Sequence, residues 1–225
     1  MELVVYDTAD DVAVGAARRV AELAAAATDR FSLGLAGGST PVATYGQLRT
    51  HDIDWERLDL WLSDERWVPH DDERSNGRMA IETLINHVGA RFARPRWSEM
   101  MEAGDSAAYY EATLRSLHEE GHPDVILLGI GEDGHTASLF PRSVALEEEV
   151  RWYVGNVIPE TGEARLTATY PLLWAARRLI VMTAGESKAE ALRDSFAGNT
   201  PAGRIGEGDA EVEWHVDTAA ASLLS

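Results

Sequence analysis

Short apolar runs alternate along the chain with longer segments in which apolar residues recur at helical spacing. The runs predict strands at residues 2–6, 31–35, 58–62, 125–130, 152–157, 165–169, 179–183 and 213–216. The longer segments predict helices: one capped by Thr8 and ending near Ala27, one beginning at Pro41, and others at 76–88, 106–120, 171–176, 187–196 and 217–224. This alternation is typical of an α/β fold with a mainly parallel, Rossmann-like sheet flanked by helices. Without internal repeats or a linker, residues 1–225 are expected to form a single domain.

The charge and the composition narrow the class of protein. The 225 residues include 38 acidic and 20 basic side chains, a formal net charge of −18. Such a charge argues against nucleic acid or an anionic membrane as a partner, because both carry negative charge. There is no cysteine, which excludes disulfides and thiol chemistry. No signal peptide or run of ~20 apolar residues is recognisable, so a cytoplasmic protein is expected.

Two segments match known motifs by sequence but lack the local structure that each motif requires. Residues 118–122 fit the zinc-protease pattern H-E-x-x-H, but Gly121 and the proline after the motif break the helix that this site needs. Residues 129–134 fit the dinucleotide fingerprint G-x-G-x-x-G. There, however, Glu132 and Asp133 put carboxylates where a pyrophosphate would lie. We therefore predict neither a metal site nor a nicotinamide site.

The first loop whose residues suggest ligand binding follows the strand at 31–35. Its sequence Ala-Gly-Gly-Ser-Thr-Pro contains Gly37, Gly38, Ser39 and Thr40. The glycines allow a ligand close to the backbone, and hydroxyls together with helix amides bind anions. A tight turn with Thr40 as the helix cap is the structural alternative. Because this loop lacks carboxylates in a strongly acidic chain, we favour phosphate.

The second loop, 63–75, follows the strand at 58–62 and opens with Asp64 and Arg66. A carboxylate can hold sugar hydroxyls and a guanidinium can hold an anionic group. A surface ion-pair network is an equally simple explanation, and such networks contribute little to stability. This segment alone does not distinguish ligand binding from a surface ion-pair network.

The third loop follows the buried strand at 125–130 and contains Asp133 and His135 among three glycines. A histidine at a glycine-rich strand end is well placed to transfer protons near neutral pH. Asp133 would orient the imidazole ring or bind substrate hydroxyls. A lone histidine is more often structural, but the composition of this loop favours catalysis.

Lys188 is the single lysine among the 20 basic side chains. It stands near the start of the helix predicted at 187–196. A compact ammonium group suits a phosphate at such a position better than a guanidinium does. The alternative is that this lysine stands near the helix start by chance, because a single residue allows no statistical argument.

These segments together resemble the 6-phosphogluconolactonase family. The resemblance rests on AGGSTP, SDERWVP with a following SN, GIGEDGHTASLFP, RLTATYPLL and GESKAEAL, and it covers nearly the whole chain. It implies the fold shared with glucosamine-6-phosphate deaminases, a sugar-phosphate substrate, and no cofactor or metal. The implied reaction is hydrolysis of 6-phospho-D-glucono-1,5-lactone to 6-phospho-D-gluconate, in the oxidative pentose phosphate pathway.

The resemblance also implies roles for individual residues. His135 takes the position of the general base, Asp133 that of the neighbouring acid, and Asp64 that of an acid which serves catalysis in the deaminases. The implied substrate-binding residues are Gly37, Gly38, Ser39, Thr40, Arg66, Arg165 and Lys188. Ala36 departs from the family pattern, which commonly has serine there, and so lacks one hydroxyl.

Two other functions stay open at this point. The first is a glucosamine-6-phosphate deaminase/isomerase, although the Thr136–Pro141 segment after the histidine differs from the deaminase continuation. The second is a non-catalytic sugar-phosphate sensor, although the chain has no recognisable output module. The sequence leaves the oligomeric state open, a monomer included.

Overall fold

A computed structural model describes residues 1–118 and 121–224 of the chain. Its main element is a seven-stranded sheet in the order β1-β10-β9-β6-β2-β3-β5, with every neighbouring pair parallel. The strands are β1 (Glu2–Tyr6), β2 (Phe31–Leu35), β3 (Leu58–Leu62), β5 (Arg91–Ala93), β6 (Val125–Gly129), β9 (Arg178–Thr183) and β10 (Glu211–Asp217). The predicted α/β fold with a mainly parallel sheet is confirmed.

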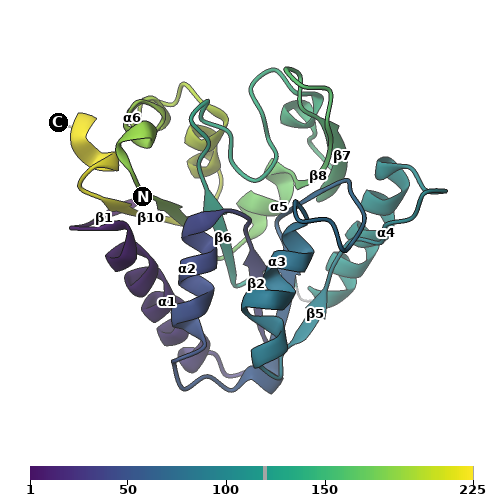
Figure 1. Cartoon of the computed structure of the whole chain (residues 1–225), viewed down its shortest axis with the longest axis horizontal. Helices are drawn as coiled ribbons and strands as arrows, with labels where there is room; N and C mark the ends of the chain where they lie inside the picture. Colours follow the sequence, from purple (N-terminus) through teal and green to yellow (C-terminus); the bar gives the residue numbers. More distant parts are fainter. Residues whose placement is uncertain (119–120, 225) are drawn as a thin grey trace.

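Helices cover both faces of this sheet. The helices are α1 (Ala9–Ala26), α2 (Ser39–Leu48), α3 (Asn76–Thr83), α4 (Ala103–Leu117), α5 (Tyr170–Ala175) and α6 (Ala189–Phe196). Short 3-10 helices occupy Trp55–Arg57, Ile85–His87, Val144–Glu147, Glu186–Lys188, Pro201–Glu207 and Ala220–Leu223. One apolar core lies between the sheet and α1, α2 and α3, and a second lies between the sheet and α4, α5 and α6. Figure 1 shows the first group of helices in front of the sheet.

A second, three-stranded antiparallel sheet was not expected. It consists of β4 (Asp64–Arg66), β8 (Ala164–Ala168) and β7 (Tyr153–Val157), in that order. The prediction of a loop throughout 63–75 is therefore wrong at β4. This strand has three polar residues and no apolar pattern, so only its pairing with β8 defines it. The pairing sets Arg66 directly opposite Arg165.

Helix α2 begins at Ser39, two residues before the predicted start at Pro41. Its N-cap is Gly38, whose φ of 115° favours glycine. Proline is tolerated within the first helical turn, where no backbone N–H is needed for the helix. The alternative that made Thr40 the cap is wrong, because Thr40 lies inside the helix and its carbonyl accepts from the Thr44 hydroxyl at 3.0 Å.

Other differences are local. Strand β5 was missed, and the predicted C-terminal helix at 217–224 is a single 3-10 turn. The helix predicted at 106–120 begins at Ala103, and residues 119–120 lie outside the described residues. The rejected zinc motif also spans those two positions. Its His118 is buried and hydrogen-bonded to Ser32.

Two absences hold within the described ranges 1–118 and 121–224. No group of three or more His, Cys, Asp or Glu side chains there is arranged to hold a metal ion. No helix in this part of the chain is both long and apolar enough to cross a bilayer.

Candidate active site

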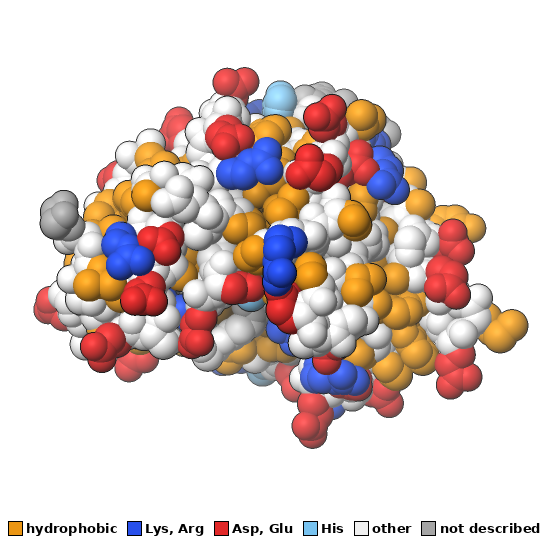
Figure 2. Space-filling view, turned by 90° about the horizontal axis from the view of Figure 1, so that it is seen from above, with side chains coloured by type: hydrophobic (Ala, Val, Ile, Leu, Met, Phe, Trp, Pro, Cys, Tyr) orange, Lys and Arg blue, Asp and Glu red, His pale blue; other side chains and the backbone are white. Residues whose placement is uncertain are grey.

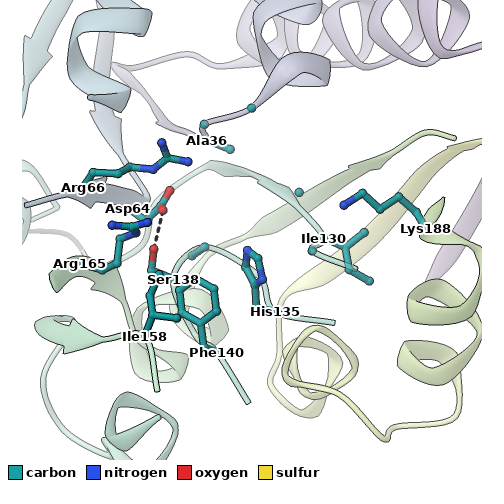
Figure 3. A pocket seen from close by; sticks show the side chains of 15 residues that line it. Ala36, Asp64, Arg66, Ile130, His135, Ser138, Phe140, Ile158, Arg165 and Lys188 are labelled. Atoms are coloured by element: carbon teal, nitrogen blue, oxygen red, sulfur yellow. Dashed lines mark hydrogen bonds between the residues drawn. The ribbon is translucent and has the colours of Figure 1, made fainter. Parts of the chain in front are cut away.

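A cavity of about 360 Å³ opens at the carboxyl ends of the parallel strands, where open α/β sheets bind ligands. The loops after β2, β3 and β6 all reach it, as the sequence predicted from their polar composition. Its lining consists of Ala36, Gly37, Gly38, Asp64, Arg66, Gly129, Ile130, Gly131, His135, Ala137, Ser138, Phe140, Ile158, Arg165 and Lys188 (Figure 3). A cavity of this size accepts a small molecule.

The glycine loop contributes backbone to the cavity. Gly37 and Gly38 line it, whereas the side chains of Ser39 and Thr40 do not. The first amides of a helix have no partner inside the helix, and those of α2 begin directly after Gly38. The structure thus brings this loop to the cavity as an amide surface, without the two predicted hydroxyls.

The carboxylate of Asp64 is buried and held on both oxygens. Its Oδ2 accepts from the Ser138 hydroxyl at 2.7 Å, and its Oδ1 accepts from the side-chain amide of Asn76 at 3.1 Å (Figure 3 shows the first of these bonds). Each carboxylate oxygen can accept more than one hydrogen bond, so both keep capacity for a further donor. This arrangement suits the binding of a substrate hydroxyl.

Glu65, the next residue, was not singled out in the sequence. It is buried beneath the start of α3 and accepts hydrogen bonds from four groups: Arg66 N, Ser75 Oγ, Asn76 N and Gly77 N. Burial raises the pKa of Glu65, and these four donors oppose part of that rise. Glu65 therefore anchors α3 to β4, a link across ten residues that no local pattern indicates.

His135 and Asp133 form the one acid–imidazole pair of the cavity among the described residues. Nδ1 of His135 lies 2.5 Å from Oδ1 of Asp133, which also accepts from the His135 backbone N–H at 3.1 Å. A carboxylate can only accept, so Nδ1 carries the hydrogen and Nε2 is left to take a proton. Burial raises the pKa of Asp133, but the bonds from His135 outweigh it and leave the pKa below its usual value.

The turn that carries His135 is tightly packed. The N–H of Gly131 donates to the His135 carbonyl at 2.9 Å, and that of Gly134 donates to the Gly131 carbonyl at 3.0 Å. A Cβ on Gly131 would lie 2.1 Å from Nδ1 of His135, so only glycine fits there. On another side the ring packs against Phe140, with ring centroids 4.2 Å apart. These neighbours restrict the imidazole to one orientation.

Three cationic side chains reach the cavity from two sides. Arg66 and Arg165 lie together near Asp64, and Lys188 extends from the other side of His135 (Figure 3). Arg66 donates to the Arg74 carbonyl at 2.8 Å, while its buried Nε has no hydrogen-bond partner among the described residues. Arg165 pairs with Glu163 at 2.7 Å. The guanidinium groups of Arg66 and Arg165 line the cavity and can therefore meet an anionic ligand there.

The chain as a whole is acidic. Figure 2 looks onto the molecule from above and shows acidic side chains scattered over this face, with basic side chains between them. The net charge of −18 repels anions at a distance. Binding of an anion must therefore depend on the local cations and on the amides of α2.

The fold and the cavity define the class: an α/β protein with a parallel sheet, whose strand ends carry a cavity lined by a glycine loop, a histidine and three cationic side chains. Residues 7–214 match the family described as "Glucosamine-6-phosphate isomerases/6-phosphogluconolactonase". The chain belongs to this family, as its sequence motifs predicted.

Individual relatives agree with this assignment. A Rhizobium meliloti protein named 6-phosphogluconolactonase is 38% identical over 197 residues, which cover 84% of this chain and 81% of that protein. A Mycobacterium leprae protein of the same name is 34% identical, and the match covers 94% of each chain. The crystal structure of a 6-phosphogluconolactonase from Shewanella baltica superimposes with a TM-score of 0.88 at 26% identity, covering 97% of this chain and 98% of the other.

Proposed function

We propose that this chain is a 6-phosphogluconolactonase in which His135 is the general base. The activity follows from the family and from relatives that carry this name over most of the chain. The observation that supports the role of His135 is its bond to Asp133, which leaves Nε2 able to accept a proton inside the cavity. We also propose that both sheets act as one domain, since residues from both line this cavity.

The phosphate of the substrate would bind over the amino-terminal end of α2. The amides after Gly38 would donate to it, and Lys188 and one or both of Arg66 and Arg165 would neutralise its charge. The presence of these three cationic side chains in the same cavity as Gly37 and Gly38 supports this position for an anion. Ser39 and Thr40 would contribute through backbone amides, since their side chains do not line the cavity.

Hydrolysis would then proceed in two proton transfers. A water oxygen attacks the lactone carbonyl carbon while Nε2 of His135 takes a proton from that water. The tetrahedral intermediate collapses, the bond from this carbon to the ring oxygen breaks, and the protonated imidazole returns the proton to the ring oxygen. The carboxylic acid so formed ionises and releases one proton per turnover. A lactone is a reactive ester, so no covalent enzyme intermediate is needed.

The oxyanion of the intermediate needs hydrogen-bond donors. Backbone amides of a glycine-rich turn are one kind of group that can supply them. Within the turn that carries His135, the amides of Gly131 and Gly134 already donate to backbone carbonyls. The donors would therefore come from other groups at the cavity wall, such as the guanidinium groups near Asp64.

The remaining expectations concern the substrate class, the cellular location and the binding partners. The substrate class, a sugar phosphate, follows from the family, and a cytoplasmic location without nucleic-acid or membrane partners remains a prediction from the sequence. No cofactor is invoked in the proposed reaction.

A proton-release assay tests the function directly. Freshly generated 6-phospho-D-glucono-1,5-lactone should be hydrolysed faster than its spontaneous rate, in proportion to enzyme concentration. Release of ammonia from glucosamine-6-phosphate would instead identify a deaminase. Saturable binding of sugar phosphates without either reaction would identify a sensor.

We expect Asp133→Asn to lower kcat by about tenfold or more, with little change in KM, because the imidazole loses its orientation and its preferred tautomer. The pKa of Asp133 lies below its usual value, so the carboxylate is ionised at any pH above the ordinary carboxyl pKa. Its bond to His135 is lost only when the pH falls below that lowered pKa. Steady-state kinetics at pH 7 to 8, where the Asp133 carboxylate is ionised, should therefore show this loss in full. Equal kcat values would contradict the role.

A further inference from the structure

The Ser-Asn pair after the SDERWVP segment has no assigned role in the reaction above. Asn76 is the first residue of α3, and its neighbour Ser75 is the N-cap of that helix. Asn76 is buried but does not line the cavity, so it does not meet the substrate. Its contacts nevertheless reach two different parts of the site.

The first part is the acidic strand β4. The side-chain amide of Asn76 donates to the backbone carbonyl of Asp64 at 3.0 Å and to its Oδ1 at 3.1 Å. The backbone N–H of Asn76 donates to Glu65 at 2.7 Å. Asn76 therefore holds the first two residues of β4 and fixes how the Asp64 carboxylate is oriented.

The second part is the glycine loop. A Cβ placed on Gly37 would lie 2.1 Å from Oδ1 of Asn76, and its three nearest heavy atoms would all belong to that side chain. The φ of Gly37 lies outside the region reserved for glycine, so its backbone conformation alone does not exclude alanine. The carboxamide of Asn76 therefore requires glycine at position 37.

These contacts join three segments of the cavity wall. The glycine loop packs on Asn76, Asn76 bonds to one oxygen of Asp64, and Ser138 bonds to the other. Ser138 lies three residues after His135 in the same loop, and its backbone is held in turn by Thr167 of β8 at 3.0 Å. The spacing between the phosphate-binding amides and the imidazole thus depends on this buried chain of contacts.

We propose that Asn76 is a positioning residue that sets the glycine loop and the Asp64 carboxylate in register with His135. This inference rests on the proposed lactone hydrolysis. Displacement of a reacting group by about 1 Å can cost on the order of 100-fold in rate. Asn76→Ala should accordingly lower kcat/KM by about 10- to 100-fold.

A double-mutant cycle between positions 37 and 76 tests the proposal. Gly37→Ala alone should lower kcat/KM by at least about tenfold, because the added methyl displaces Asn76. In the Asn76→Ala background the same substitution meets no carboxamide, so the double variant should match Asn76→Ala within about twofold. Losses that multiply, or a fully active Asn76→Ala, would overturn the proposal.

Asn76→Asp keeps the shape of the side chain and supplies a readout that a merely structural role would not move. Its carboxylate would face Asp64 at the distance of the present hydrogen bond, so one of the two acids would hold a proton at low pH. That proton would restore the bond, and kcat/KM should fall as the pH rises and the proton is lost. A wild-type pH profile in this variant would count against Asn76.

Two controls separate the possible failures. Asn86→Ala changes an exposed asparagine in the 3-10 turn after α3 and should leave kcat/KM unchanged. If the wild-type chain does not hydrolyse the lactone, the proposed function fails. The cycle can then be read by calorimetry with inorganic phosphate as the probe of the glycine loop. Additive effects on phosphate affinity in that measurement would overturn the positioning role separately.

Discussion

We expect His135→Ala to lower kcat by about 10²- to 10⁴-fold with little change in KM, the range that one positioned acid–base group contributes. His135 is the one histidine in the described lining of the cavity, and the Asp133 carboxylate orients its ring, so this substitution removes the imidazole from the site. Proton release from the fresh lactone, corrected for spontaneous hydrolysis, measures the effect. The residual rate should come from substrate binding and from stabilisation of the oxyanion.

A matched substitution controls for the loss of a histidine as such. His87 lies exposed in a 3-10 turn, where its ring nitrogen is 3.0 Å from the Glu82 carbonyl. His87→Ala should keep the wild-type kcat. Thermal unfolding should show that His135→Ala is folded, since His135 belongs to a loop and not to either core. A folded His135→Ala enzyme with nearly normal turnover would refute the general-base role.

The second large effect is expected on substrate binding. Lys188→Met should raise KM by about 10- to 100-fold, since a hydrogen bond to a charged group contributes roughly 1.5–3 kcal/mol. Because the phosphate does not react, its bonds are equal in the ground and transition states, and kcat should change little. Initial rates over a range of lactone concentrations separate the two constants. An unchanged KM would remove Lys188 from the phosphate site.

The control for Lys188 must remove the same charge elsewhere. Arg193 on α6 is exposed and paired with Asp194 at 2.8 Å. Arg193→Met makes the same change to the net charge of −18 but leaves the cavity intact. A rise in KM limited to the Lys188 variant would separate local binding from the general field of the protein. The KM of Lys188→Arg should lie between those of the wild type and Lys188→Met, because a planar guanidinium fits a compact phosphate position less well than an ammonium group does.

The fold was predictable where one strand carries its own apolar run. Strands β2, β3 and β6 are buried in the sheet, and apolar residues dominate each of them, so their positions were correct from sequence. Strand β4 could not be predicted in this way. Its three residues are polar and become a strand only by pairing with β8, about a hundred residues away in the sequence. Local patterns contain no information on such a partner.

In the candidate site, too, residues that stand out within their own segment were predictable, and residues that act through distant contacts were not. The chemistry of His135, Asp133 and Lys188 was visible because each stands out by type within its own segment. Glu65 and Asn76 were not assigned roles, because their importance lies in contacts between β4, α3 and the glycine loop. Ser39 and Thr40 lie in the first turn of α2 and their side chains are not part of the cavity lining, so a role for their hydroxyls stays a prediction.

The register of the small sheet has a thermodynamic consequence. Arg66 and Arg165 face each other across β4 and β8, and like charges directly opposite destabilise a strand pair. Glu163 offsets part of this repulsion through Arg165. A doubly charged ligand between the guanidinium groups would remove the rest, so ligand binding and the integrity of this sheet are linked. The melting temperature should therefore rise with the concentration of 6-phosphogluconate, and this rise should be smaller in Arg66→Met. The empty enzyme would then be the looser form, and occupancy of the site would itself protect the protein from heat and proteolysis.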